Sequence, residues 1–232
     1  MSRAWPGLMA MIWGNINLWA AGVKVNISGL ENLDGSGPYI FVSNHQGWFD
    51  IFAALGKLPV RFSWLAKVEL FRIPILGLAM SRAGYIPIDR NDHRKAMTSM
   101  HRAAEIIRGG TSVFIFPEGT RSEDGVIKDF KKGAFMLAAK SQQPVVPISI
   151  SGSYRILLKN DWKIHPGEIG FAIGRPIETA GADGKNRDRL LGEVREAIRA
   201  NLTPEEAGSD PIAGPATKSA TSHDGSSICR DA

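Results

Sequence analysis

The sequence contains one cysteine, Cys229, among 232 residues. A single thiol excludes a disulfide scaffold and any metal site built from several cysteines, and it fits a reducing compartment. Several catalytic motifs are also missing: the nucleophile elbow GxSxG, the Walker A loop, the dinucleotide-binding turn GxGxxG and the zinc motif HExxH. No basic run is interleaved with aromatic residues, so nothing indicates a nucleic-acid partner. No metal site is predicted.

What is present is the composition of a globular protein with one sizeable core. Hydrophobic residues make up 44% of the chain and charged residues 22%, which excludes a wholly disordered or fibrous protein. The length suits one α/β domain rather than two large ones. Twenty-eight basic against 23 acidic residues give a net charge of +5. This bias favours anionic partners such as phosphates, nucleotides or an acidic membrane surface.

Residues 1–24 form an apolar segment that contains Trp5, Trp13 and Trp19. A membrane span needs about 20 uninterrupted apolar residues, and this segment is interrupted by Pro6, Gly7, Gly14, Asn15 and Asn17. It also lacks the basic start and cleavage site of a signal peptide. Because indole rings favour the membrane boundary, we predict an amphipathic interfacial helix. A helix that covers the domain's own core is the alternative.

The other end of the chain changes character at Thr203. Residues 203–232 are rich in Pro, Ser, Thr, Gly and Ala and show neither aromatic residues nor an apolar period, so we predict a disordered tail. His223 and Cys229 fall in this tail and are poor catalytic candidates. The remaining residues, 25–202, are predicted to form the domain.

Short apolar runs alternate with helical periodicity in this domain. The runs 39–43, 112–116 and 145–150 are nearly continuous, which is typical of strands buried on both faces. Residues 61–66 and 85–88 are further candidate strands, and 169–173 alternates like a strand nearer an edge. One helix is predicted from a cap at Asn91 or Asp92 to the glycines at 109–110, and two more at 132–141 and 190–202. We therefore predict an α/β fold, a mixed, mainly parallel sheet flanked by helices on both faces, with ligands beyond the strands' carboxyl ends.

A histidine and an aspartate follow the first of these strands, at His45 and Asp50. On one continuous helix, five residues separate side chains by about 140°, so the two would diverge. If His45 lies in the strand-to-helix turn and Asp50 in the first helical turn, the carboxylate reaches back to Nδ1. That contact would leave Nε2 free as a general base. The alternative is a polar strand end in which His45 bonds a backbone carbonyl and Asp50 favours the helix dipole.

Charged turns follow two other predicted strands. Glu118, Gly119, Thr120 and Arg121 come after residues 112–116; glycine permits close backbone approach, and guanidinium binds phosphate or carboxylate oxygens bidentately. Two roles are open for Glu118, pairing with Arg121 or accepting a hydrogen bond from a substrate hydroxyl. Arg90 follows residues 85–88. The alternatives are a solvated surface turn and a helix cap with an ion pair of little energetic value.

These segments resemble motifs of the glycerolipid acyltransferase family, closest to its 1-acyl-sn-glycerol-3-phosphate acyltransferases. Residues 44–50 are similar to the signature NHxxxxD, residues 84–90 to the second motif, residues 116–122 to the third and residues 146–148 to the fourth. The four motifs occur in the family's order between residues 25 and 177. Without an evident protein nucleophile, direct attack by a substrate hydroxyl is the simplest chemistry for a histidine base.

The resemblance implies transfer of a fatty acyl group from acyl-CoA or acyl carrier protein to the sn-2 hydroxyl of a lysophospholipid, 1-acylglycerol 3-phosphate, giving phosphatidic acid. His45 would act as the base and Asp50 would orient it. The positions matched to acceptor binding are Arg90, Glu118, Gly119, Thr120 and Arg121. The thioester is a co-substrate, and no cofactor is expected. Members work at the cytoplasmic face of the inner membrane, which implies peripheral or monotopic attachment to a membrane surface.

Two departures from the family pattern keep other acceptors open. Gly47 stands where the family often has Ser, and Pro87 where it often has Phe. The alternatives are another lyso-acceptor, such as a lyso-ornithine lipid, or glycerol 3-phosphate. Thioester hydrolysis is a second enzymatic alternative, and a lipid-binding module without catalysis is a third.

Overall fold

The computed structural model describes residues 5–35, 37–158, 161–179 and 185–208. The helices are α1 (Trp5–Ala20), α2 (Phe49–Lys57), α3 (Leu76–Arg82), α4 (His93–Arg108), α5 (Gly133–Ser141), α6 (Lys185–Arg199) and α7 (Pro204–Ala207), with short 3-10 helices η1 (Leu30–Asn32), η2 (Val68–Arg72) and η3 (Ser153–Arg155). The strands are β1 (Val23–Ser28), β2 (Ile40–Ser43), β3 (Phe62–Lys67), β4 (Ile86–Ile88), β5 (Ser112–Ile115), β6 (Val145–Ser151) and β7 (Gly167–Ile173).

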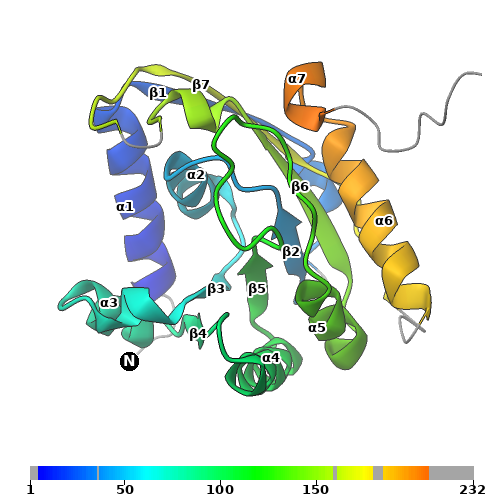
Figure 1. Cartoon of the computed structure of the whole chain (residues 1–232). Coiled ribbons are helices and arrows are strands. Elements are labelled where there is room, and N and C mark those ends of the chain that lie inside the picture. Colours follow the sequence, from blue (N-terminus) through cyan, green and yellow to red (C-terminus); the bar gives the residue numbers. More distant parts are fainter. Residues whose placement is uncertain (1–4, 36, 159–160, 180–184, 209–232) are drawn as a thin grey trace, which may run out of the picture.

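The strands form one seven-stranded sheet in the order β1-β7-β6-β2-β5-β3-β4 (Figure 1). From β6 to β4 each strand is parallel to its neighbour. Strand β7 pairs antiparallel with β6 and parallel with β1. The predicted mixed, mainly parallel sheet is therefore confirmed, and the strand predicted near an edge is β7, next to the edge strand β1.

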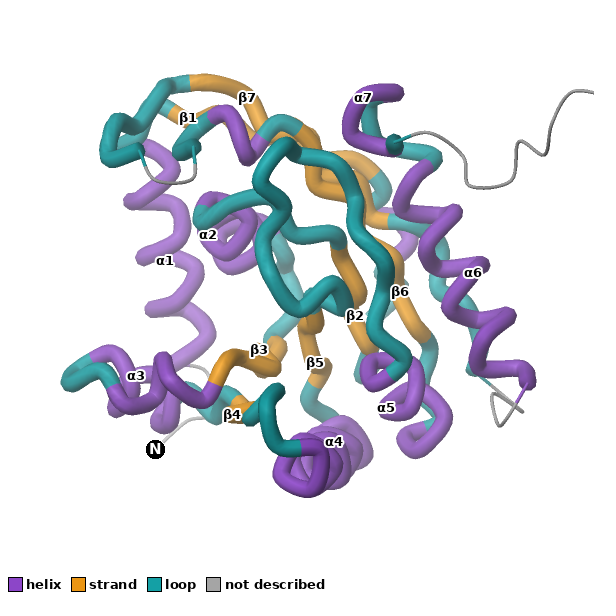
Figure 2. The backbone as a smooth tube through the Cα atoms, viewed as in Figure 1, coloured by secondary structure: helices purple, strands orange, loops and turns teal. Residues whose placement is uncertain are grey.

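Two hydrophobic clusters cover the two faces of the sheet because alternate side chains of each strand point to opposite sides. Along β2, Ile40 and Val42 pack with residues of α4, α5 and α6. Tyr39 and Phe41 pack with residues of α1 and α2 on the other face. This explains why β2, β5 and β6 read as continuous apolar runs. Figures 1 and 2 show the helices on the two sides and the loop between β5 and α5 crossing in front of β2.

Helix α1 packs on α2 through its small and polar residues. A Cβ atom on Gly14 would lie 2.7 Å from the backbone nitrogen of Gly56, so the two backbones approach closely here. Asn15 donates from Nδ2 to the Gly56 carbonyl at 2.9 Å and accepts from Lys57 Nζ at 2.8 Å. Two of the residues that interrupt the apolar run, Gly14 and Asn15, thus contact α2, as does the ring of Trp13, whose centroid lies 5.0 Å from that of Phe52.

The outward side of α1 is apolar. The exposed apolar side chains of this helix are Leu8, Met9, Met11, Ile12, Trp13, Ile16 and Trp19. The amphipathic pattern that we predicted is therefore not confirmed: apolar groups face solvent while Asn15 faces the protein. Among the described residues, no helix is long and apolar enough to cross a membrane.

Three elements differ from the sequence-based prediction. Strand β1 and helix α3 were not predicted; β1 is an edge strand whose outward residues are polar, and α3 spans only seven residues. The predicted tail begins too early, because residues 203–208 are part of the fold. Thr203 caps α7 in a capping box with Glu206, and the buried Glu206 carboxylate accepts from Ser151 Oγ and the Gly152 amide. The rest of the predicted tail, 209–232, lies outside the described residues.

Replacing a glycine by alanine within a helix ordinarily stabilises a protein. Because α1 lies so close to α2, we expect the opposite effect at Gly14. Gly14→Ala should lower the free energy of unfolding by about 1–3 kcal/mol, because the new methyl group overlaps the α2 backbone. Gly192→Ala in α6 is the control, since a Cβ there meets no atom within 4 Å; it should stabilise the helix by about 0.5–1 kcal/mol. Urea unfolding measures both, and a stabilising Gly14→Ala would contradict the packing.

Candidate active site

His45 and Asp50 are in direct contact at the carboxyl end of β2. His45 Nδ1 lies 2.7 Å from Asp50 Oδ2. The histidine occupies the turn after β2, and the aspartate lies in the first turn of α2, near the positive end of the helix dipole. The predicted geometry, in which the carboxylate reaches back to Nδ1, is confirmed. A carboxylate only accepts hydrogen bonds, so the shared proton belongs to Nδ1 and Nε2 is the free basic nitrogen.

The Asp50 carboxylate is fully buried and collects donors from two segments. Its Oδ2 also accepts from the backbone amides of Gln46 at 2.7 Å and Gly47 at 2.9 Å. Its Oδ1 accepts a short hydrogen bond from the hydroxyl of Ser153 in η3. Because these donors fix the carboxylate on every side, Asp50 cannot turn away from His45 without losing several hydrogen bonds.

The imidazole plane is fixed by stacking. The rings of His45 and Phe116 have centroids 3.9 Å apart and an interplanar angle of 10°. Phe116 stacks in turn on Trp64 of β3, with centroids 5.3 Å apart. The His45 side chain keeps 14% of its surface exposed, so a bound substrate can reach it.

The backbone of His45 is held by the loop after β5. Its amide donates to Glu118 Oε1 at 2.8 Å, and its carbonyl accepts from the Ser122 amide at 2.7 Å. The other Glu118 oxygen accepts from the Lys128 amide at 3.3 Å. Glu118 therefore orients the histidine turn from a buried position.

Burial raises the pKa of Glu118 to about 8, although the backbone amides of His45 and Lys128 act in the opposite direction. The sequence left two roles open for Glu118. One of them, an ion pair with Arg121, is not formed among the described residues. Arg121 lies over the Trp48 ring instead, with Cζ 4.9 Å from the ring centroid.

The other residues predicted to bind the acceptor surround this loop. Gly119 adopts φ +80°, where a Cβ would lie 3.0 Å from Lys131 Nζ, and Thr120 is exposed. Lys128 Nζ donates to the Arg121 carbonyl at 2.8 Å. The basic groups of Arg121, Lys128 and Lys131 thus lie near the turn that bears His45. Such a cluster suits an anionic group such as a phosphate.

Arg90 lies farther away than the other predicted residues. It is exposed and follows β4, the strand that β5 and β3 separate from β2. At the usual spacing between neighbouring strands, this places its backbone roughly 14 Å along the same edge of the sheet. Only a long or mobile side chain, or an extended substrate, connects it to His45.

The sequence analysis assigned no role to three residues that build the site, although two of them, Asn44 and Phe116, fall in the recognised motifs. Ser153 and Phe116 touch Asp50 and the His45 ring respectively. The Asn44 amide bonds both the amide and the carbonyl of Ile150, at 2.8 and 2.7 Å, and so extends the β2–β6 pairing to the start of the turn. The position of Asn44 and Phe116 at the ends of predicted strands could have indicated a place in the site. No sequence signal pointed to Ser153. No group of three or more metal-ligating side chains occurs among the described residues.

The comparisons with known proteins agree on one family. Residues 24–151 match the family model described as Acyltransferase. A chloroplastic 1-acyl-sn-glycerol-3-phosphate acyltransferase, LPAT1 of Arabidopsis thaliana, is 39% identical over 86% of this chain and 55% of its own. The alpha form of this enzyme from Homo sapiens is 34% identical over 76% of this chain and 63% of its own. The chain therefore spans little more than half of the length of these curated relatives.

A solved structure has the same fold. The 1-acyl-sn-glycerophosphate (LPA) acyltransferase PlsC from Thermotoga maritima superposes with a TM-score of 0.73 at 29% identity, covering 83% of this chain and 76% of that chain.

The buried Glu118 predicts a pH dependence of stability. Its pKa in the folded protein, about 8, lies above the ordinary value of 4.5, so the folded state binds the proton more tightly than the unfolded chain does. The contribution of this group to stability is therefore fully present below the unfolded pKa and is lost as pH rises through the folded pKa. Glu118→Gln should lack this loss.

Urea unfolding of the wild type and of Glu118→Gln, from the unfolded to the folded pKa of Glu118, measures how the free energy of unfolding of each depends on pH. The exposed Glu105→Gln in α4 is the matched control and should follow the wild type. Parallel curves for the wild type and Glu118→Gln would contradict the assignment.

Proposed function

The chain belongs to the Acyltransferase family, and on this premise we propose that it transfers a fatty acyl group to the sn-2 hydroxyl of 1-acylglycerol 3-phosphate. The product is phosphatidic acid, and the donor is acyl-CoA or acyl-acyl carrier protein. The observation that carries the proposal is the His45–Asp50 contact of 2.7 Å beside a basic turn. The curated relatives named as 1-acyl-sn-glycerol-3-phosphate acyltransferases support this acceptor.

In the proposed reaction His45 acts as general base and then as general acid. Nε2 takes the proton of the acceptor hydroxyl while its oxygen attacks the thioester carbonyl. The tetrahedral intermediate collapses, the carbon–sulfur bond breaks, and the leaving thiolate receives the proton from Nε2. Asp50 holds Nδ1 throughout and stabilises the imidazolium that forms between these steps. Such a positioned base accelerates a reaction by about 10²–10⁴-fold.

The loop after β5 that carries Arg121, Lys128 and Lys131, the basic turn, orients the acceptor in this proposal. The guanidinium of Arg121 and the ammonium groups of Lys128 and Lys131 bind the acceptor phosphate, with Gly119 allowing close approach. Holding the acceptor in this way replaces a random encounter by a bound, oriented one. The residues required for the step come from the chain itself, and neither a metal nor a cofactor is part of the proposal.

We place the proposed reaction at a membrane surface, the cytoplasmic face of the inner membrane, where the lysolipid acceptor resides. The exposed apolar side of α1 supports peripheral or monotopic attachment, since an apolar helix face with two exposed tryptophans, Trp13 and Trp19, favours an interface over water.

A panel of acceptors tests the proposed substrate. One labelled acyl thioester is supplied with lysophosphatidate, a lyso-ornithine lipid or glycerol 3-phosphate, and with no acceptor. We expect transfer to lysophosphatidate. Transfer to another acceptor alone would replace this substrate, and acyl release without any acceptor would indicate a hydrolase.

His45→Ala should abolish turnover, with a loss of at least about 10²–10⁴-fold, because it removes the base that takes the hydroxyl proton in the proposed reaction. The far-ultraviolet circular dichroism should stay that of the wild type. His101→Ala, which removes an exposed histidine of α4, is the matched control and should keep full activity. Turnover retained by His45→Ala would remove His45 as the base. An absence of turnover in the wild type as well would leave a lipid-binding module as the better account.

Arg121→Ala should chiefly raise the KM for the acceptor, by about 10- to 100-fold, since a charged hydrogen bond to the phosphate is lost in the ground state as well as in the transition state. The kcat should change little. Steady-state kinetics with varied acceptor measures both constants, with the exposed Arg102→Ala of α4 as control. An unchanged acceptor KM would remove Arg121 from the phosphate site.

A further inference from the structure

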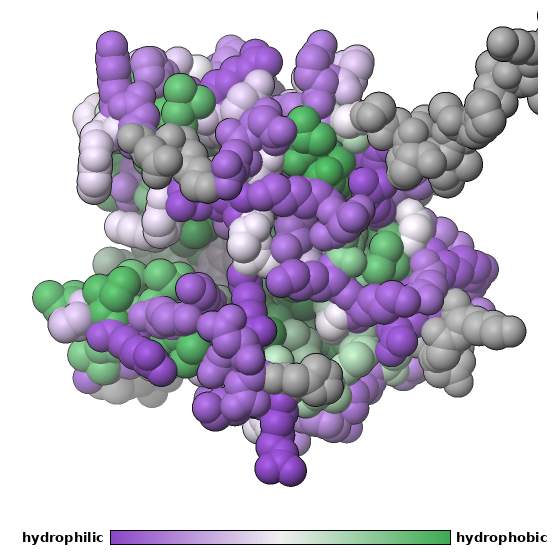
Figure 3. All heavy atoms as spheres, viewed as in Figure 1, coloured by the Kyte–Doolittle hydropathy of each residue, from purple (hydrophilic) through white to green (hydrophobic). Residues whose placement is uncertain are grey.

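An apolar turn projects from the protein between η2 and α3. Ile73, Ile75, Leu76 and Leu78 are all exposed, and the Ile75 side chain keeps 85% of its surface in solvent. Single exposed apolar residues are normal, but four within six residues form a patch that water does not favour. Figure 3 shows apolar residues gathered over the end of the molecule where α3 lies in Figure 1.

The backbone of this turn is strained in a way that presents Ile75 to its surroundings. Ile75 has φ 66° and ψ −57°, and the Leu76 amide donates to the Pro74 carbonyl at 2.7 Å. These values are those of a γ-turn of the rare, strained kind. A β-branched residue at positive φ is a true outlier, and glycine is the residue that adopts such a conformation without steric cost. The neighbouring Gly77 fixes the turn, because a Cβ there would lie 2.1 Å from the Phe71 carbonyl.

Strain of this kind persists where the conformation has a use. An isoleucine at this position is unfavourable both in water and on this backbone, so a compensating free energy must come from another contact. Transfer of the side chain into an apolar environment outside the protein supplies it.

The charge around the turn indicates what this environment is. Between residues 67 and 82 the sequence has three basic residues, Lys67, Arg72 and Arg82, and one acidic residue, Glu69. All three basic residues are exposed. An apolar tip with a cationic rim is complementary to a bilayer with anionic headgroups.

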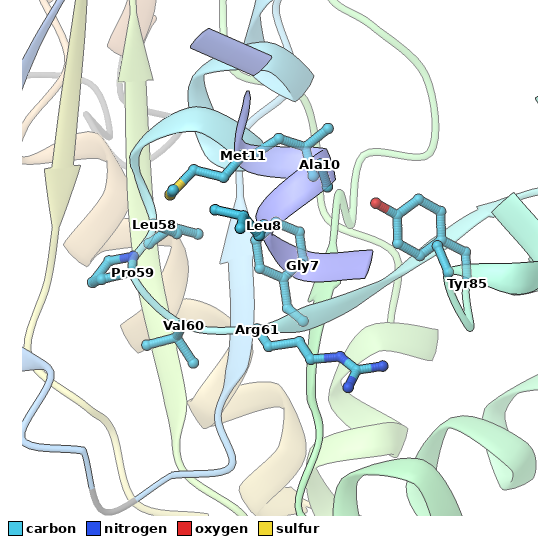
Figure 4. Close-up of a pocket in the computed structure, with 12 residues that line it drawn as sticks. Gly7, Leu8, Ala10, Met11, Leu58, Pro59, Val60, Arg61 and Tyr85 are labelled. Atoms are coloured by element: carbon cyan, nitrogen blue, oxygen red, sulfur yellow. The ribbon is translucent and has the colours of Figure 1, made fainter. Parts of the chain in front are cut away.

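The end of α3 that is remote from the turn lies beside α1. Leu8 of α1 and Ala83, which follows α3, line one pocket of about 240 Å³ with Arg61 and Tyr85 (Figure 4). This pocket lies at the amino ends of β3 and β4, away from His45. The end of α3 is thus continuous with the exposed apolar side of α1. The chain enters the turn, however, from the carboxyl end of β3, the edge of the sheet at which His45 follows β2.

We propose that the turn at residues 73–78 inserts into an anionic phospholipid bilayer as a second attachment site beside α1. The axis of α1 and a second point of contact together fix the orientation of the protein on a flat membrane, and the second lies on the segment that leaves the active-site edge. The inference rests on the proposed function in one respect, that the acceptor is a lipid of the same bilayer.

Binding to vesicles tests the insertion. Ile75→Asn should weaken binding to mixed phosphatidylglycerol–phosphatidylcholine vesicles by about tenfold, as expected for a buried side chain of this size. Leu30→Asn, at a leucine beyond β1 that is also exposed, should leave vesicle binding unchanged. Unchanged binding of Ile75→Asn would overturn the proposal.

A labelled cysteine reports the environment of residue 75 directly. Because Cys229 is the one native cysteine, Ile75→Cys in a Cys229→Ser background carries a single environment-sensitive fluorophore. Its emission should shift to the blue with anionic vesicles and be quenched by lipids with a quencher on the acyl chain. Emission that stays water-like on bound protein would overturn insertion. Self-association that Ile75→Asn abolishes would assign the turn to a second copy of the chain instead.

Acyl transfer separates this inference from the proposed function. Ile75→Asn should lower transfer to lysophosphatidate held in vesicles and leave transfer to a dissolved short-chain analogue unchanged. If the wild-type protein acylates neither, the proposed function fails, and the vesicle-binding and fluorescence results still decide the insertion. Equal losses with both acceptors would contradict a role at the membrane.

Discussion

The site depends on one buried carboxylate. Asp50 accepts hydrogen bonds from the His45 ring, from two backbone amides of the same turn and from Ser153 of η3. Unsatisfied donors in a buried turn are costly, so this arrangement fixes the turn and the imidazole together. The segment that carries Ser153 is itself held by the Glu206 carboxylate. The start of the presumed tail therefore supports the centre of the site.

The parts that the sequence predicted are those governed by local rules. Continuous apolar runs predicted the central strands, and the interval between His45 and Asp50 predicted their contact once the histidine was placed in a turn. The position of these groups at the carboxyl end of a parallel strand followed from the fold class. Glu118 was recognised as part of the site, but its contact with the His45 backbone was not.

The parts that were missed depend on distant pairing. Ser153 lies about a hundred residues from Asp50 in sequence, and no local pattern connects them. Strand β1 is an edge strand with a polar outer side, and Glu206 looked like part of a polar tail. The amphipathic pattern predicted for α1 is not confirmed, and the contact of Gly14 and Asn15, which interrupt the apolar run, with α2 was not predicted. Sequence periodicity does not reveal which face of a helix another helix covers.

The central claim is that Asp50 holds the proton on Nδ1 of His45 and leaves Nε2 unprotonated and free. Nitrogen-15 magnetic resonance of the histidine-labelled protein tests this directly, because the chain has only five histidines and a His45→Gln variant identifies the signal. For the neutral imidazole, the account predicts a protonated Nδ1 and a Nε2 shift typical of a bare imidazole nitrogen. A proton on Nε2, with Nδ1 bare, would contradict it.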